Sequence, residues 1–364
     1  MSYSVVLLPA LSPEYAACER TLVDAGVRMA LPHRASWALA RRKVDSHRVV
    51  LSASGGGGAC VGAFGVDIGA SRALPGYRLW RVERFGPGLP RRAWPAAVQA
   101  LADLARKDGR VLRVNVEVFA RDAEERIAMG ELLAAAGFTP APEARNWSTT
   151  LTIDLQRSEQ ELLASFSQLA RRGIRSVDKL PVQVRPIEDP QYADRMEDLR
   201  RETLGRTGGD YEALFNWPGV MELSRRVPDA SRLVGLFRTD RTGPDALLGF
   251  YWGWSNGDSV SYFSGASARP DDLKQVKIGH PLMWDLIRWA KQNGATWFDL
   301  GGVTDMTTVT EDPVAGITAF KHLFSKQRAE IAADWVLEPR PIPARLATLV
   351  HTGVAWVSRV AGLW

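Results

Sequence analysis

The predicted secondary-structure elements follow an order that occurs twice along the chain, and this repetition constrains the fold most. The first half is predicted to contain a helix over 14–30, strands over 48–54, 59–68 and 79–84, a helix over 94–107, a strand over 111–118 and a helix over 122–136. The second half is predicted to contain helices over 159–177, 192–204, 281–292 and 319–325 and strands over 232–238, 246–255, 259–268, 296–300 and 331–337. Each half is thus predicted to be a mainly antiparallel sheet with helices packed on it, which gives an α+β fold of two tandem domains.

The length of the chain agrees with this division. Its 364 residues exceed what one hydrophobic core usually serves. A content of 46% hydrophobic and 24% charged residues is typical of globular proteins and excludes disorder or a collagen-like structure. We predict a first domain over 1–145, a second domain over 146–340 and a C-terminal amphipathic helix over 341–364.

Charge and cysteine content limit the partners and the compartment. The 46 Lys and Arg residues and 41 Asp and Glu residues give a formal charge of +5, which permits an anionic partner without requiring one. Cys18 and Cys60 are too few for a disulfide framework or a cysteine zinc site, which fits a reducing compartment. The five histidines lack metal-ligand spacing, so we expect neither a metal nor a cofactor.

We expect neither a targeting segment nor a membrane-spanning one in this chain. Its N-terminus lacks the basic region of a signal peptide, and no apolar run reaches the ~18–20 residues of a transmembrane helix. We expect a cytoplasmic monomer.

The last segment, 341–364, differs in composition from the rest of the chain. It contains Arg345 and Arg359 but no acidic residue, and its leucines and valines follow helical spacing. Besides disorder, two readings stay open: a helix docked on the protein's own core, or an interfacial helix whose Trp356 and Trp364 touch a membrane surface. The second reading adds a peripheral contact with the inner face of the membrane.

Two neighbouring motifs in the second half are the most informative for function. In the run LIRWAKQNGATWFDLGGV (286–303), a helix ends at Asn293-Gly294 and a buried strand leads into Asp299-Leu300-Gly301-Gly302. Glycines after a strand allow a ligand or backbone to approach closely. The second motif, GITAFKHLF (316–324), places Lys321 among apolar residues, where a lysine needs an anionic partner or a cleft, unless it extends to solvent from an amphipathic helix.

These two motifs together resemble the C-terminal signature of the FemABX family of peptidyl transferases. The segment LTIDLQRSEQELLASFSQLARRGIRSVDK (151–179) resembles the stretch that opens the second domain of that family. RASWALARRK (34–43) and RFGPG (84–88) are similar to its Ser-x-x-Trp and Arg-Gly-Pro elements. The resemblance extends from residue 34 to about residue 335.

The resemblance implies two GNAT-like domains and an aminoacyl transfer reaction. In the family, an amino acid moves from aminoacyl-tRNA, the co-substrate, to an amine, often on a peptidoglycan precursor. The family's catalytic lysine corresponds to Lys321, whose charge would stabilise the oxyanion formed when the amine attacks the ester carbonyl, and Phe320 would shape the wall of the site.

The resemblance also implies binding residues. The positions that correspond to contacts with the substrate are Arg34, Trp37, Arg206, Tyr211, Tyr262 and Asp299. The basic run Arg171, Arg172, Arg175 and Lys179 would meet tRNA phosphates, although a solvated helix face explains it equally well. The segment Gly88-Leu89-Pro90 lacks the acid that usually follows the Arg-Gly-Pro element, so the resemblance supplies no general base.

Two other functions fit the same fold. An acyl-CoA-dependent N-acyltransferase would cradle pyrophosphate on a Gln/Arg-x-x-Gly-x-Gly/Ala loop, but the corresponding segment reads Gln275-Val276-Lys277-Ile278-Gly279-His280. A binding protein without turnover would keep the fold and bind a cell-wall precursor or RNA. The acceptor also stays open between a lipid-linked muropeptide, its soluble nucleotide-linked precursor and a small amine metabolite.

Overall fold

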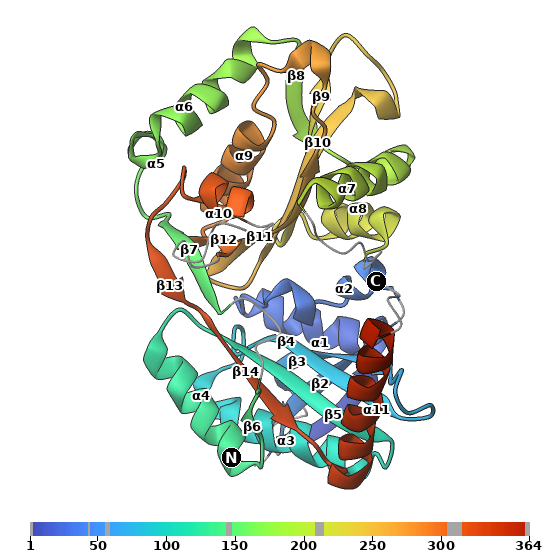
Figure 1. Ribbon diagram of the computed structural model, residues 1–364. Helices are drawn as coiled ribbons and strands as arrows, with labels where there is room; N and C mark the ends of the chain where they lie inside the picture. The colour runs from blue at the N-terminus through green and yellow to red at the C-terminus, as the bar shows by residue number, and fades with distance from the viewer. Residues whose placement is uncertain are drawn as a thin grey trace.

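The computed structural model describes residues 3–42, 44–54, 59–142, 148–207, 215–303 and 315–360. Their strands form two sheets of seven strands, stacked end to end along the molecule (Figure 1). This architecture confirms the predicted α+β class and the tandem arrangement. Each sheet is mixed, because one parallel pair interrupts the antiparallel neighbours.

The first sheet draws on both ends of the chain. Its strands, in spatial order, are β1 (Tyr3–Pro9), β2 (Asp45–Ala53), β3 (Cys60–Ala70), β4 (Arg78–Phe85), β5 (Val111–Phe119), β14 (Ala332–Leu337) and β6 (Thr139–Pro140). Its helices are α1 (Pro13–Asp24), α3 (Trp94–Lys107), α4 (Ala123–Ala135) and α11 (Pro341–Val360), and the short α2 (Trp37–Ala40) lies toward the second sheet. Alternation along β2 separates two cores, since Val49 and Leu51 face α3 and α4 whereas Val50 faces α1.

The second sheet has the same plan. Its strands, in spatial order, are β8 (Val182–Pro186), β9 (Ser231–Arg238), β10 (Leu247–Ser255), β11 (Ser259–Ser267), β12 (Trp297–Gly302), β7 (Thr149–Asp154) and β13 (Arg328–Glu330). Its helices are α5 (Glu159–Ser165), α6 (Gln168–Arg175), α7 (Ala193–Thr207), α8 (Trp217–Arg226), α9 (Gly279–Gln292) and α10 (Ala315–Lys321). One face packs on α5, α6 and α9, and the other packs on α7 and α8 around an aromatic core.

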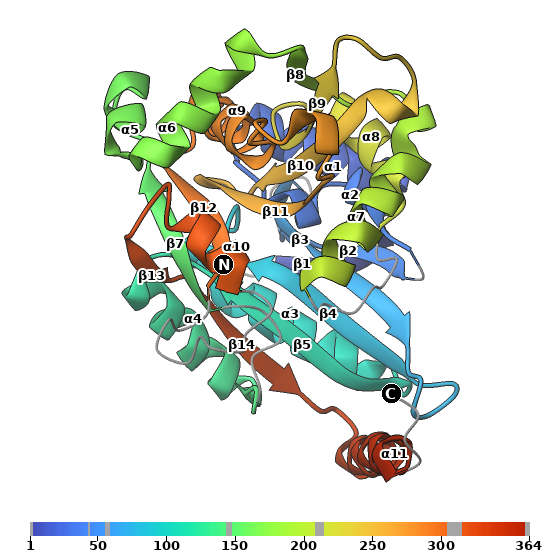
Figure 2. The same ribbon diagram turned by 45° about the horizontal axis from the view of Figure 1, so that its top comes forward.

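The two sheets exchange one strand with respect to chain order. In the first sheet, β4 and β5 are the parallel pair and β14 lies antiparallel on β5; in the second, β11 and β12 are parallel and β7 lies antiparallel on β12. Because β7 precedes the other strands of the second sheet and β14 follows them, the chain crosses between the sheets twice (Figure 2). The second domain was predicted to extend to residue 340, but the strand at 332–337 belongs to the first sheet.

Some helices and strands of the structure differ from the predicted ones. The single helix predicted over 159–177 is two helices, because Ser158 caps α5 in a capping box with Glu161 and Ser167 starts α6 by accepting a hydrogen bond from the amide of Ala170. Strands β1, β6, β7, β8 and β13 and helices α2 and α8 were not predicted. The four glycines between the strands predicted over 48–54 and 59–68, Gly55–Gly58, lie outside the described residues.

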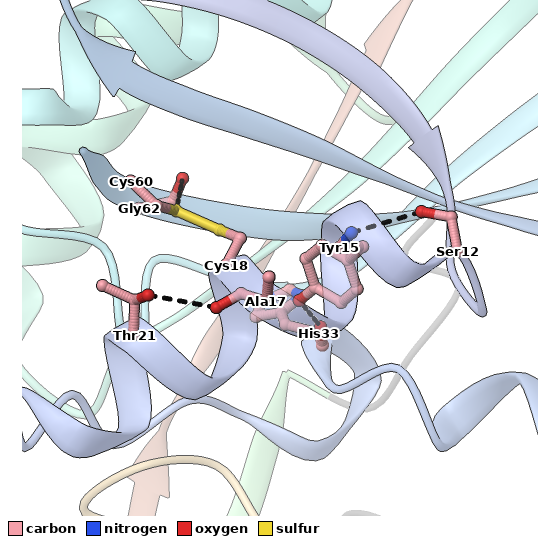
Figure 3. Close-up of a disulfide and its surroundings, with 8 residues drawn as sticks. All are labelled: Ser12, Tyr15, Ala17, Cys18, Thr21, His33, Cys60 and Gly62. Atoms are coloured by element: carbon pink, nitrogen blue, oxygen red, sulfur yellow. Dashed lines mark hydrogen bonds between the residues drawn. A yellow bond between two sulfur atoms is a disulfide. The ribbon is translucent and has the colours of Figure 1, made fainter. Parts of the chain in front are cut away.

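Cys18 on α1 and Cys60 on β3 form a disulfide (Figure 3). Both lie in the small core between α1 and the first sheet, where Tyr15 donates a hydrogen bond to the carbonyl of His33. The sequence predicts no disulfide framework, and one bridge is not a framework. The bridge itself was not predicted, and it forms because the fold brings α1 onto β3.

No helix among the described residues is both long enough and apolar enough to cross a membrane.

Candidate active site

Lys321, the last residue of α10, is a buried cation at the wall of a cavity. The residue is only 6% exposed, and its Nζ donates a hydrogen bond of 2.6 Å to the carbonyl of Gly302. The cavity has a volume of about 780 Å³ and lies between α7, β10, β11, the segment before α9 and α10. Burial lowers the pKa of Lys321 to about 8, and the nearby Asp299 carboxylate partly opposes this shift.

Asp299 on β12 anchors the turn that holds Lys321. Its carboxylate is 2% exposed and accepts hydrogen bonds from the hydroxyl of Thr150, from Ser261 Oγ at 2.7 Å and from the amide of Gly301 at 2.7 Å. These donors tie β7, β11 and β12 together beneath the lysine. Asp299 was predicted to bind substrate, but it does not line the cavity, and the protein itself supplies its hydrogen-bond donors.

Gly301 allows the lysine to approach the end of β12. Its φ is +81°, a left-handed conformation that other residues adopt only with strain, and a Cβ there would lie 3.2 Å from Lys321 Nζ. The two glycines predicted to permit close approach thus serve the lysine: Gly301 leaves it room and Gly302 accepts its hydrogen bond.

Aromatic rings form the apolar part of the cavity. Tyr251 and Tyr262 lie with ring centroids 4.7 Å apart, and burial raises the pKa of both hydroxyls, so both stay protonated at neutral pH. Phe320, next to Lys321, also lines this wall. A Cβ at Gly279 would lie 2.5 Å from the Tyr251 hydroxyl and 3.2 Å from the Phe320 ring, which explains the glycine at the start of α9.

Arg206 is the cation at the outer side of the same cavity. It lies on α7, and its Nη2 donates to the carbonyl of Ser267 at 2.7 Å and to Thr203 Oγ1 at 3.1 Å. The structure therefore brings together Lys321, Phe320, Tyr262 and Arg206 from the predicted site residues. Tyr211 lies outside the described residues.

His280 also lines the cavity and was not predicted as a site residue. It is 7% exposed, and its ring lies between Phe320, at a centroid distance of 5.3 Å, and Gly173 on α6, where a Cβ would be 2.7 Å from the imidazole. Burial lowers its pKa, so the ring is neutral at pH 7. His280 thus fills the position where an acyl-CoA loop has a small residue.

Arg34 and Trp37 lie in the contact between the two domains rather than at the cavity. Arg34 pairs with Glu19, with Nε and Oε1 2.5 Å apart, and its Nη1 lies 3.6 Å from Asp229 of the second domain. Trp37 is 1% exposed and packs edge-on against Trp254 with ring centroids 4.8 Å apart. The short helix α2 thus anchors the first domain in the aromatic core of the second.

The predicted basic run occupies α6 and the turn after it. Arg171 is held by the protein itself, since its Nη1 donates to the carbonyls of Ala164 and Phe166. Arg172, Arg175 and Lys179 are exposed. Three of the four cations are thus available to solvent or to a polyanion.

A second cavity, of about 830 Å³, occupies the equivalent place in the first domain. It opens where β4 and β5 end, whereas the cavity at Lys321 opens at β11. Gly257, Asp258 and Thr296 of the second domain close the second cavity. Arg28, Arg91 and Arg121 line it, but so do Asp122, Glu125 and Asp258. The equivalent placement follows from the repeated topology.

Asp299→Asn is expected to lower the pKa of Lys321 further below about 8, because the substitution removes the charge that favours the lysine's protonated form. It should also lower the free energy of unfolding by about 1–3 kcal/mol, since the amide cannot accept from three donors as the carboxylate does. NMR titration of ¹³C-labelled lysine and thermal unfolding measure the two effects. Asp154→Asn, at the end of β7, is the control. An unchanged Lys321 titration in Asp299→Asn would contradict the coupling.

Comparison with known proteins agrees with this fold. The acetyltransferase (GNAT) domain family matches residues 164–321, the stretch that ends at Lys321. No curated protein matches the sequence. Among solved structures, FemX is similar with a TM-score of 0.69 and 15% identity, covering 95% of this chain and 100% of FemX.

Two further structures have the same tandem plan. L-PGS from Bacillus licheniformis is similar with a TM-score of 0.54 and 12% identity, covering 95% of this chain and 97% of that chain. A tandem GNAT protein from the clavulanic acid biosynthesis pathway is similar with a TM-score of 0.51 and 15% identity, covering 93% and 99%. The chain therefore has the FemABX-like fold of two tandem GNAT domains, which confirms the resemblance drawn from its sequence.

Proposed function

We propose that the protein is an aminoacyltransferase that moves an amino acid from aminoacyl-tRNA to an amine and forms a peptide bond at the Lys321 cavity. The observation that carries this proposal is the buried Lys321 at the cavity wall, whose pKa of about 8 leaves it mainly protonated at pH 7. A cation held in a place of low polarity stabilises negative charge far better than one in water. The FemABX-like fold and the match of Lys321 and Phe320 to the family's signature support the same reaction.

The chemistry needs little from the protein beyond positioning and charge. The nitrogen of the acceptor amine attacks the ester carbonyl, a C–N bond forms, and the C–O bond to the tRNA ribose breaks. The amine loses a proton and the departing ribose oxygen gains one, through water or the substrates. Lys321 stabilises the oxyanion between these steps, and the Gly302 carbonyl and Asp299 keep its ammonium in place.

A peptidoglycan precursor suits the rest of the cavity as the acceptor. Arg206 at its outer side suits a phosphate or carboxylate, and the faces of Tyr251 and Tyr262 suit a sugar or peptide. Arg172, Arg175 and Lys179 on the neighbouring helix and turn offer cations to tRNA. We propose that the protein works in the cytoplasm as a monomer, without a cofactor.

Acyl-CoA-dependent acylation is the second candidate, favoured by the match to the acetyltransferase domain family. The start of α9 weighs against it, because His280 occupies the place of the small residue that would let pyrophosphate approach. Lys277 also lines the cavity and is the phosphate ligand this candidate would use.

A transfer assay tests the proposal. Purified protein is incubated with a pool of tRNA charged with labelled amino acids and a cell-wall precursor, with labelled acetyl-CoA in a parallel reaction. We expect label to move from tRNA to a ribonuclease-resistant product. Lys326 is an exposed lysine just after α10, and Lys326→Ala is the control for the substitution of Lys321. It should leave the rate unchanged.

Each other result selects a different function. Label that moves only from acetyl-CoA contradicts the tRNA reaction and establishes the acyl-CoA reaction. Binding of tRNA or precursor without any product establishes a binding protein without turnover.

A further inference from the structure

The first half of helix α11 carries two apolar faces, and only one of them is covered by other described residues. Ile342, Leu346, Leu349 and Val350 are 74%, 52%, 67% and 43% exposed. Their spacing of four, seven and eight residues from Ile342 places them on one side of a helix. Large apolar side chains grouped in this way on a surface indicate a binding face.

The opposite side of α11 is docked on the first sheet. Ala344 and Ala347 are 1% and 8% exposed and pack against Leu112 and, around it, Leu79 and Tyr77. Figure 2 shows the helix nearly end-on at the margin of the molecule. Of the two readings left open by the sequence, docking on the protein's own core is thus seen for the first half of the helix. The docking fixes the exposed row in an outward direction.

Polar contacts hold the start of the helix to the same sheet. Arg113 on β5 pairs with Glu338, at 2.6 Å between Nη2 and Oε1. Arg340 Nη2 donates to the carbonyl of Arg106 at 3.0 Å. The row therefore belongs to a rigid part of the surface rather than to a loose tail.

The surroundings of α11 are strongly basic. The segments that meet there are the β3–β4 connection at 71–79, the end of α3 with the start of β5 at 106–113, and 338–349. They hold eight basic residues and two acidic ones, Asp108 and Glu338. From residue 339 onward the sequence contains no Asp or Glu. This end of the molecule therefore concentrates positive charge in a chain whose total is +5.

We infer that this face docks on the surface of an anionic lipid membrane, with the four apolar side chains inserted at the boundary between headgroups and acyl chains. An exposed apolar row on a basic helix suits this location, because burial of the row and attraction to anionic headgroups act together. A second copy of the chain is disfavoured as the occupant, since it would bring an equally basic surface. RNA would satisfy the charge but leave the apolar row in water. The inference does not depend on the proposed transfer reaction.

Co-sedimentation with vesicles tests this inference on the full chain. We expect the protein to bind vesicles of phosphatidylcholine with about one third phosphatidylglycerol, and to bind pure phosphatidylcholine at least about tenfold more weakly. The double variant Leu346→Asp, Leu349→Asp should bind the anionic vesicles at least about tenfold more weakly than the wild type. Ile127→Asp, at an equally exposed position (61%) on α4, is the matched control and should bind normally.

The remaining measurements decide between occupants. Arg345→Glu should weaken binding to anionic vesicles and leave the melting temperature unchanged, because Arg345 is exposed and forms no ion pair with the other described residues. Equal binding by the wild type and the double variant overturns the inference. A concentration-dependent dimer that the double variant abolishes also overturns it, in favour of a second copy.

Discussion

Lys321→Ala is expected to lower the rate of aminoacyl transfer about 10²–10³-fold, the usual effect of removing one oxyanion-stabilising group. The reason is the position of Nζ, which is buried at the cavity wall and held by the Gly302 carbonyl at 2.6 Å. The transfer assay under saturating substrate measures the loss in kcat. A loss confined to KM would instead assign the lysine to substrate binding.

Stability separates a catalytic role from a structural one. Burial lowers the pKa of Lys321 from 10.5 to about 8, so the folded state holds this proton less tightly than the unfolded chain. Stability contributed by this group therefore rises with pH between about 8 and 10.5 and is lowest below that window. Lys321→Met should accordingly raise the free energy of unfolding at pH 7 by about 1–3 kcal/mol while lowering the transfer rate as much as Lys321→Ala does. A large destabilisation would show that the lysine serves the fold.

Truncation after Glu330 is expected to unfold the first domain, with a loss of at least about 5 kcal/mol, comparable to the whole stability of a typical domain. The deletion removes β14, which pairs with β5 from Ala332 to Leu337 and joins β6 to the sheet. It also removes Ile331 and Leu337 from buried positions. Hydrogen exchange of the β5 amides and thermal unfolding measure the effect.

Truncation after Pro339 is the matched control for this prediction. It removes α11 but keeps β14, so β5 should stay protected from exchange. If the shorter chain that ends at Glu330 protected β5 equally well, the strand exchange would contribute nothing to the first domain.

Local patterns in the sequence predicted many elements well. The helix predicted over 94–107 is α3, because an amphipathic period and a sharp end at Asp108 mark it. The helix that ends at Asn293-Gly294 is α9, and the φ of +72° at Gly294 is the reason for that glycine. Ser167, where α6 begins, is a residue type that favours a helix N-cap. The helical spacing of apolar residues on both sides of it nevertheless predicted one continuous helix.

Pairing between distant segments could not be read in the same way. The strand at 332–337 was found, yet nothing in its residues says that its partner is β5, more than 200 residues earlier, rather than a strand of the second sheet. For the same reason Arg34 and Trp37 were predicted at a substrate site, although both lie in the contact between the domains, where Trp37 is buried and Arg34 pairs with Glu19.

The site shows the same limit. Lys321 and Phe320 were found through resemblance to a family signature, and the geometry places both on one cavity wall. Thr150 and Ser261, which fix Asp299, were missed because an isolated hydroxyl in a buried strand has no periodic or spacing signal. Asp299 itself was found but given a role in binding, since only the structure shows how far beneath the surface it lies.

The exchanged strands have a consequence for the order in which the protein matures on the ribosome. The first five strands of the first sheet are complete once residue 119 has been made, but β5 keeps an open edge until residues 332–337 emerge. During that interval the whole second domain is synthesised, with β7 entering its own sheet. An unpaired inner edge of this kind invites pairing with other nascent chains. The rate of translation between residues 119 and 337 thus sets how long the nascent chain is exposed to misassembly, and chaperone demand should be highest there.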